Sequence, residues 1–361
     1  MSRTLEDLKL KQSLPLDVKV SLTRERIRQW INEFGEEGVY VSFSGGKDST
    51  VLLDIVRNKC GYNNVPAVFV DVPTQFPELR DFVKTYDNIV ILKPHISFME
   101  VCSEYGFPLI SKEVSNSVCE AKKYIKKNLN GKEITNEFLS HAPVRAKMVF
   151  GIYPHKEKGV LTGEYSQMYD KSKYKFFLDA DFDISDACCR VMKKTPLHKY
   201  AKETGRVPMT AQMADESRLR QHQWLQHGCN AFDAKNPISN PLSFWTENDV
   251  LTYIVRNNIQ ICSVYGKIVE DYGDQLEGQM DFSDFGLYES QKKYKCTGCE
   301  RTGCMLCGFG CHIEKSPNRF EMLKETHPGM YKLLDVVKNN GVTMREAIEW
   351  TNKHGNMNIN L

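Results

Sequence analysis

The stretch Val41-Ser42-Phe43-Ser44-Gly45-Gly46-Lys47-Asp48-Ser49-Thr50 decides the fold. A run of apolar and aromatic residues typical of a strand ends here, two glycines permit a tight turn, and a helical pattern begins at once. Backbone N–H groups at such a helix N-terminus, together with its partial positive charge, form a site for anions. The sequence therefore predicts a phosphate-binding loop made of Ser44, Gly45, Gly46, Lys47, Asp48 and Ser49.

Asp48 is the unexpected residue of this loop, because a carboxylate repels a phosphate. We expect it either to hold the loop in shape or to bind a Mg²⁺ ion that a phosphate brings with it. Lys47 is expected to stabilise charge that develops on a reacting phosphate, and both residues are predicted to be catalytic. The loop lacks the first glycine and the spacing of a Walker A motif, so it belongs to another class of phosphate site.

The pattern of the first half of the chain predicts an α/β fold. A helix is expected over residues 21–34, capped by Ser21, and strands are expected over residues 38–43, 67–71, 89–92 and 159–163. Strands that alternate with helices indicate βαβ units and a doubly wound parallel sheet.

Beyond Cys188 the pattern changes. We expect a strand over residues 207–211, helices over 217–226 and 246–255 with caps at Ser217 and Thr246, and two helices near the end. The predicted domains are an N-terminal helical segment (1–35), a nucleotide-binding domain (36–260) and a cysteine-rich loop with C-terminal helices (261–361).

Composition restricts the function. The 361 residues carry a net charge of only +2, which argues against a strongly basic nucleic-acid footprint, and the basic runs 122–127 and 171–175 are interpreted as solvated surface. A nucleic-acid substrate is therefore possible but not indicated. No apolar run is long enough for a membrane span, and the first residues have no apolar h-region, so we expect no signal peptide and a cytoplasmic protein without membrane contact. Twelve cysteines without a secretory signal indicate a reducing compartment, where clustered thiols bind metals or act as catalysts.

Several motifs resemble one family. The loop matches the SGGKDS loop of the PP-loop ATP pyrophosphatase superfamily. Val70 to Glu78 is similar to the DTG-x-x-FPET element of phosphoadenosine phosphosulfate (PAPS) and adenylylsulfate (APS) reductases, although the glycine is absent. Cys188 to Leu197 resembles the double-cysteine element of APS reductases, and Ala214 to Arg220 resembles the substrate segment. The chain is thus identified as a suspected member of the PAPS reductase family.

The resemblance implies an adenine nucleotide α-hydrolase-like fold that binds ATP or another adenine nucleotide. Asp71 and Thr74 would border the same crevice as the loop, because ligands of open α/β sheets lie at the carboxyl ends of strands. Arg218 and Arg220 would contact phosphate or sulfate, and the alternative is that they are surface residues paired to Asp215 or Glu216. PAPS reductases carry their catalytic cysteine in a Glu-Cys-Gly-Leu-His tail. Here the last cysteine is Cys311, so reduction by that route is in doubt.

The cysteine-rich segment places five thiols within residues 296–311. Thiolates select Zn²⁺ or iron–sulfur clusters, and the gap from Cys299 to Cys304 is too short for two separate zinc knuckles. APS reductases hold a [4Fe–4S] cluster with the double cysteine and a later CxxC, and this resemblance favours such a cluster over Zn²⁺ or free thiols. The candidate ligands are Cys188, Cys189, Cys296, Cys299, Cys304, Cys307 and Cys311.

Three functions remain open. The first is an enzyme that adenylates an acceptor with ATP, after which sulfur, from a donor that a partner protein could supply, displaces AMP. The second is a sulfonucleotide reductase that uses one of the clustered cysteines. The third is a non-catalytic protein that senses nucleotide or redox state.

Overall fold

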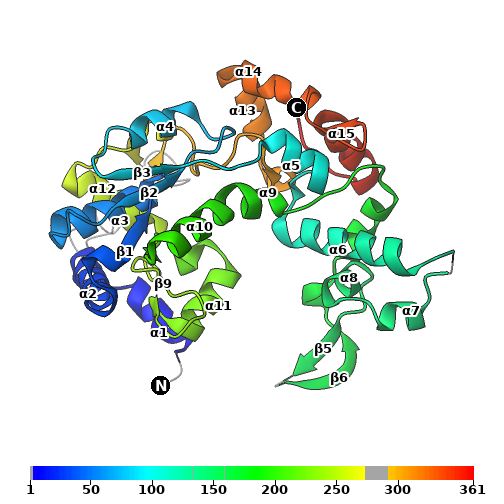
Figure 1. Ribbon diagram of the computed structural model, residues 1–361, viewed down its shortest axis with the longest axis horizontal. Coiled ribbons are helices and arrows are strands. Elements are labelled where there is room, and N and C mark those ends of the chain that lie inside the picture. Colours follow the sequence, from blue (N-terminus) through cyan, green and yellow to red (C-terminus); the bar gives the residue numbers. More distant parts are fainter. Residues whose placement is uncertain (1–2, 132, 158, 273–291) are drawn as a thin grey trace. The chain divides into compact units, whose positions relative to one another are not determined.

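The structure is a computed structural model that describes residues 3–131, 133–157, 159–272 and 292–361 (Figure 1). It divides into two compact units. Unit 1 comprises residues 1–71, 75–93 and 196–302, and unit 2 comprises residues 72–74, 94–195 and 303–361. The domain boundaries expected at residues 35 and 260 stay predictions.

Unit 1 is built on a six-stranded sheet with the order β3-β2-β1-β7-β9-β8. All neighbouring pairs are parallel except β8 with β9. Because β1 lies in the middle and later strands add on both of its sides, the sheet is doubly wound, and the predicted α/β class is confirmed. The strands are β1 (Val39–Ser42), β2 (Ala67–Val70), β3 (Ile89–Leu92), β7 (Val207–Met209), β8 (Asn230–Ala231) and β9 (Ile238–Ser239).

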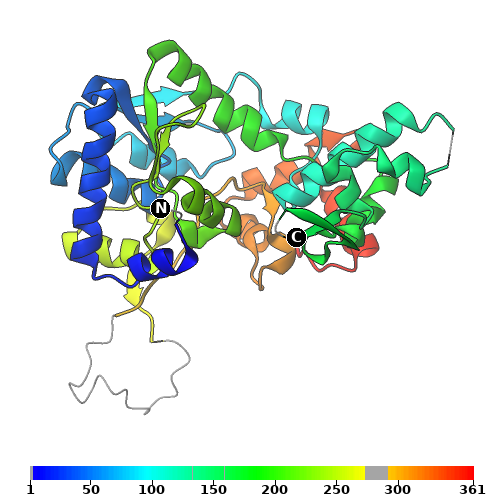
Figure 2. The ribbon, with the colours of Figure 1, turned by 90° about the horizontal axis from the view of Figure 1, so that it is seen from below.

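Helices complete unit 1. They are α1 (Leu5–Gln12), α2 (Leu16–Phe34), α3 (Lys47–Asp54), α4 (Pro77–Val83), α10 (Thr195–Thr204), which begins at the last residue of unit 2, α11 (Arg218–His227) and α12 (Glu247–Asn257). A small two-stranded sheet joins β10 (Ile268–Glu270) to β11 (Tyr294–Cys296). Buried side chains of α2, β1 and α3 share one core, and Figure 2 shows α2 as a long dark-blue helix beside the sheet.

One predicted helix start is wrong. The helix expected from Ser21 begins at Leu16, directly after Pro15, and the Ser21 hydroxyl donates to the Asp17 carbonyl inside it. Proline commonly precedes or opens a helix, because it has no N–H that the first turn would leave unsatisfied. The caps predicted at Ser217 and Thr246 are confirmed, and Thr246 forms a capping box with Asp249.

Unit 2 is mainly helical. Its helices are α5 (Phe98–Tyr105), α6 (Lys112–Asn128), α7 (Asn136–Ser140), α8 (Val144–Val149), α9 (Ala187–Cys189), α13 (Arg319–Thr326), α14 (Pro328–Tyr331) and α15 (Met344–Gly355). Two short strand pairs accompany them. Strand β4 (Leu109–Ile110) pairs with β12 (Gly308–Phe309), and β13 (Lys338–Asn339) pairs with β14 (Val342–Thr343). The strand expected over 159–163 is present as β6 (Val160–Tyr165). Its expected place in the parallel sheet is wrong, because β6 pairs antiparallel with β5 (Pro154–Glu157) in an exposed hairpin.

Within the described ranges, no helix combines the length and the apolar character that crossing a membrane requires.

Candidate functional site

The predicted phosphate loop connects β1 to α3. Gly45 adopts φ +74°, and a Cβ there would lie 2.9 Å from Cγ2 of Val83, so only glycine fits this turn without strain. The loop is held by its own serines, since the Ser44 N–H donates to Oγ of Ser49 (3.2 Å) and the Gly46 N–H donates to Oγ of Ser44 (3.2 Å). Gly45 and Ser49 are thus buried supports of the loop.

A pocket of about 170 Å³ opens at this loop within unit 1. Four of the predicted nucleotide-binding residues line it, together with six residues that the sequence did not single out for this site. The lining residues are Ser44, Gly46, Lys47, Asp48, Met213, Glu216, Glu247, Tyr265, Arg301 and Thr302.

Lys47 is the buried cation of the pocket. Its Nζ lies 3.1 Å from Oε1 of Glu247 and 2.8 Å from the Glu300 carbonyl oxygen, and it sits over the Tyr265 ring. Burial by itself lowers the pKa of Lys47, but the charges of Asp48 and Glu247 outweigh it and raise the pKa overall. The ammonium group is therefore fully charged at neutral pH.

Asp48 has a different environment. Its Oδ1 is buried, with no hydrogen-bond partner among the described residues, and burial raises its pKa despite the nearby charges of Lys47 and Arg301. A buried carboxylate oxygen without a donor is costly unless something pairs with it. In a pocket beside a phosphate loop, a divalent cation is a group of the right charge.

The cysteine-rich segment supplies one wall of the pocket. The Tyr265 hydroxyl accepts from the Lys47 N–H (3.0 Å) and lies 2.9 Å from Oγ1 of Thr302. Accepting that bond leaves the Tyr265 proton free to donate to Thr302 or to a bound oxygen. Arg301 and Thr302 thus line the pocket at the loop, and Glu300 contacts its buried lysine.

The two predicted arginines occupy different places. Arg220 pairs with Glu216, and burial and the neighbouring charge of Arg301 lower its pKa, so two guanidinium groups lie close together beside the pocket. Arg218 is exposed at the first residue of α11 and does not line the pocket.

The two nucleotide-binding residues predicted after β2, Asp71 and Thr74, are not among the residues that line the pocket. Asp71 forms an ion pair with Arg80, whose Nη2 lies 2.7 Å from Oδ1 of Asp71. Thr74 belongs to unit 2, and its buried Oγ1 has no hydrogen-bond partner among the described residues. Their contact with a nucleotide remains a prediction.

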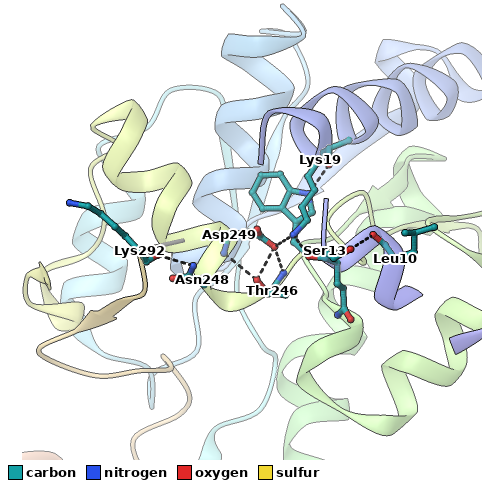
Figure 3. Close-up of polar contacts among 10 residues, drawn as sticks. Leu10, Ser13, Lys19, Thr246, Asn248, Asp249 and Lys292 are labelled. Carbon is teal, nitrogen blue, oxygen red and sulfur yellow. Dashed lines mark hydrogen bonds and ion pairs between the residues drawn. The ribbon is translucent and has the colours of Figure 1, made fainter. Parts of the chain in front are cut away.

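A buried ion pair fixes the helix that carries Glu247. Nζ of Lys19, on α2, lies 2.6 Å from Oδ2 of Asp249 and 2.5 Å from the Gln12 carbonyl oxygen (Figure 3). The same Asp249 oxygen accepts from the N–H of Thr246, the cap of α12. The pair therefore holds the start of α12, and with it Glu247, against α2.

The first turn of α12 also fixes strand β11, which precedes the residues that form one wall of the pocket. The Asn248 side chain donates to the Lys292 carbonyl (3.1 Å) and accepts from the Tyr294 N–H (3.0 Å). Figure 3 shows this contact beside the Lys19–Asp249 pair. Strand β11 is thereby fixed just before residues 300–302.

The seven candidate metal ligands divide between the units. Cys296 and Cys299 belong to unit 1, and the charges of Lys47, Glu247 and Asp48 reach Cys296. The other five belong to unit 2. Of these, Cys311 is a core thiol, since it is fully buried, donates to the Cys307 carbonyl (3.5 Å), and has a pKa that burial raises to about 12.

Four thiols of unit 2 lie near one another. The charges of Cys189, Cys304 and Cys307 all act on Cys188. The half-buried Lys193 makes a hydrogen bond to Cys304, and the charges of Cys304 and Cys189, with this bond, raise the lysine's pKa against the effect of desolvation. Among the residues that the structure describes, no group of three or more His, Cys, Asp or Glu side chains has the arrangement of a metal site. The thiols are thus gathered without metal-binding geometry.

Comparison with known proteins establishes the family. The sequence matches the family model of the phosphoadenosine phosphosulfate reductase domain over residues 38–129 and 147–308. This match covers more than half of the chain, and the chain therefore belongs to the PAPS reductase family, whose members are enzymes of sulfonucleotide metabolism.

The other comparisons add little. A crystal structure of phosphoadenylyl-sulfate (PAPS) reductase from Candida auris in complex with phosphate is 15% identical, with a TM-score of 0.35, over 84% of this chain and 99% of that chain. No curated protein matches the sequence.

Sequence reasoning missed more than half of the pocket lining. Glu247 is the first residue of α12, where an acidic residue is common for reasons of helix stability alone. Tyr265, Arg301 and Thr302 follow the sheet by many residues, and no spacing relates them to the loop. The only available signal was the charged turn Glu300-Arg301-Thr302 inside a segment otherwise composed of cysteine and glycine.

Proposed function

We propose that this chain is an enzyme of sulfur metabolism that binds ATP with Mg²⁺ at the pocket and adenylates an acceptor. The observation that carries the proposal is the presence of three carboxylates, Asp48, Glu216 and Glu247, in the lining of a phosphate-loop pocket. Glu247 pairs with Lys47 and Glu216 pairs with Arg220, which leaves Asp48 as the lining carboxylate without an ion pair to a described residue, and its charge would repel a bare polyanion. Mg²⁺ is usually bound through one or two carboxylates and the phosphates of its nucleotide, so an acidic lining favours a metal-bound nucleotide.

The residues fit this use. Asp48 would hold Mg²⁺ through its unpartnered buried Oδ1, and the ion would neutralise phosphate charge. Lys47, already charged and buried, would stabilise the α-phosphate as negative charge develops on it. Arg220 and Arg301 would contact the terminal phosphate, which relieves the repulsion between two neighbouring guanidinium groups.

The proposed reaction has two displacements. An acceptor oxygen attacks the α-phosphorus, the bond from this phosphorus to the bridging oxygen breaks, and pyrophosphate leaves with that electron pair. A sulfur nucleophile, a thiol or persulfide supplied by a donor, then attacks the activated acceptor, and AMP leaves. Only the first displacement takes place at residues of the pocket.

For unit 2 we propose a [4Fe–4S] cluster held by Cys188, Cys189, Cys304 and Cys307. Four soft sulfur ligands are the appropriate donor set, and the half-buried Lys193 offsets the negative charge of thiolates. Zn²⁺ is the alternative metal. Side chains must still adjust to reach a metal-binding arrangement, because the described residues show none.

A second candidate function is sulfonucleotide reduction. The family supports it, and so does Cys189, whose pKa is lowered by a hydrogen bond from Cys188 and by the charges of Lys112 and Lys193. A thiolate is the form of cysteine that attacks sulfur.

One set of assays separates the two functions. Purified anaerobically and supplied with MgATP and labelled pyrophosphate, the protein should exchange label into ATP when a true acceptor is present, and it should bind MgATP more tightly than Mg-free ATP. Release of sulfite from APS or PAPS, with no preference for Mg²⁺, would establish the reductase instead. Asp48→Asn should abolish the Mg²⁺ preference while leaving the melting temperature near that of the parent protein.

A further inference from the structure

The near-neutral charge of the whole chain conceals a strongly basic segment. Residues 122–175 contain twelve lysines and arginines and five aspartates and glutamates, a net charge of +7. The remaining residues carry 36 basic and 41 acidic side chains, a net charge of −5. A charge asymmetry of this size indicates an electrostatic surface for a polyanion. We call residues 122–175 the basic segment.

The basic segment folds as one part of unit 2. Helices α6 and α8 pack on each other, and both contact the following 3₁₀ segment Ser172–Asp179. Hairpin β5–β6 extends from α8, as Figure 1 shows, and the chain returns to α8 where the Lys171 N–H donates to the Met148 carbonyl (2.8 Å). The charges of α6, α8 and the 3₁₀ segment are therefore collected on elements that pack together.

Some of these cations support the fold. Lys122 donates to the carbonyls of Ala180 and Phe182, and Lys171 pairs with Glu113. Others are exposed: Lys123, Lys126 and Lys127 occupy the last turns of α6, and Arg145 lies on α8. Lys123 makes a hydrogen bond to the Cys119 thiol, and none of the four forms an ion pair with a described residue, so their positive charges are not neutralised within unit 2.

The hairpin adds exposed apolar and aromatic side chains. Tyr165 is 61% exposed, and Val160 and Leu161 are 70% and 61% exposed. Tyr169 is also exposed, and its ring packs on Tyr153 with centroids 4.9 Å apart. Aromatic rings beside a cationic surface serve as platforms on which unpaired bases stack.

We propose that the basic segment binds nucleic acid that has unpaired bases. The α6 cations and Arg145 contact phosphates, and Tyr165 stacks on a base. The aromatic rings favour nucleic acid over an anionic membrane, which offers charge but no planar group. The proposal goes beyond the nucleotide chemistry of unit 1 and does not depend on it.

The test measures binding of fluorescein-labelled RNA and DNA oligonucleotides of about 20 nucleotides, single-stranded and duplex, by anisotropy. Affinity should fall steeply with salt, and single strands should bind more tightly than duplexes. The triple variant Lys123→Glu, Lys126→Glu, Lys127→Glu should bind at least about tenfold more weakly, with a salt slope shallower by about 2. Tyr165→Ala should remove the single-strand preference and keep the salt slope.

The matched control is the triple variant Lys324→Glu, Lys338→Glu, Lys353→Glu, which changes the net charge equally on exposed lysines of unit 2 outside the basic segment. Its affinity should stay within about twofold of the parent protein once the general charge effect is removed by salt. Equal losses in both triple variants, or no binding at low salt, would overturn the proposal. The proposal would also be overturned if oligonucleotides did not bind while vesicles rich in phosphatidylserine bound in a way that depends on the α6 lysines. Circular dichroism of each variant confirms that it is folded.

Discussion

At the residue scale, Gly46 is constrained by space rather than by backbone angle. Its φ of −76° suits any residue, but a Cβ would lie 3.1 Å from each of three oxygens, those of Ser44, Tyr265 and Thr302. We expect Gly46→Ala to weaken ATP binding at least about tenfold, about 1.4 kcal/mol, because the methyl group pushes the wall from the loop. Calorimetric titration measures this. Gly329→Ala, whose Cβ meets nothing within 4 Å, is the control, and equal affinities of both variants would contradict the assignment.

The two arginines of α11 give a matched pair. Arg220 lies near Asp48 and Arg301, whereas Arg218 is exposed and outside the pocket lining. A charge-assisted contact is worth about 1.5–3 kcal/mol, so Arg220→Ala should raise the dissociation constant of ATP about ten- to a hundredfold. Arg218→Ala should change it less than about twofold. If the two variants bind alike, Arg220 makes no nucleotide contact and serves only its ion pair with Glu216.

At the element scale, the Lys19–Asp249 pair joins α2 to α12. Lys19→Met should cost about 3–5 kcal/mol of unfolding free energy, because it leaves the Asp249 carboxylate buried without a cation. Urea denaturation measures the loss. Lys9→Met, on the exposed side of α1, should be nearly neutral. The idea fails if the Lys19 variant is as stable as the Lys9 variant, or if Lys19→Met with Asp249→Asn recovers nothing.

Sequence patterns predicted where helices and strands lie better than they predicted which other elements those helices and strands pack or pair with. The strand–loop–helix at Ser44 to Ser49 and the capping boxes are local, so neighbouring residues suffice to specify them. Strand β6 shows the limit, because Val160 and Leu161 look like a buried pair in sequence and are exposed on a hairpin. Pairing and burial depend on distant residues, which a local pattern does not contain.

At the scale of the whole molecule, the site was predicted only where it is continuous in sequence. Ser44 to Asp48 were identified from one motif, but Glu216, Glu247, Tyr265 and Arg301 reach the same pocket from four separate segments. Each of them lies at a helix start or in a connecting segment, and local sequences of this kind occur in many unrelated folds. Tertiary packing alone brings them to the loop, through fixed points such as Lys19 with Asp249 and Asn248 with Tyr294.

The division into two units also changes what is expected of the cysteine-rich segment. Together with Cys188 and Cys189 its five thiols made seven candidate ligands, and these are not one set. Cys296 and Cys299 belong to unit 1, beside a wall of the pocket, while Cys304 and Cys307 belong to unit 2 with the Cys188–Cys189 pair. The proposed cluster therefore draws on unit 2 alone. Cys304→Ser should remove one of four ligands, and Cys296→Ser should remove none.

We therefore predict that protein purified anaerobically contains iron and sulfide and absorbs broadly in the visible range. Cys304→Ser should lose most of the iron, and Cys296→Ser should keep it, because only the first change removes a thiolate from the group near Lys193. Metal analysis and the absorption spectrum measure this without any assay of activity. One tightly held zinc in place of iron would identify the alternative metal on the same ligands. Equal loss of metal in both variants would show that the ligand set spans the two units, and a folded, metal-free protein would refute a metal centre.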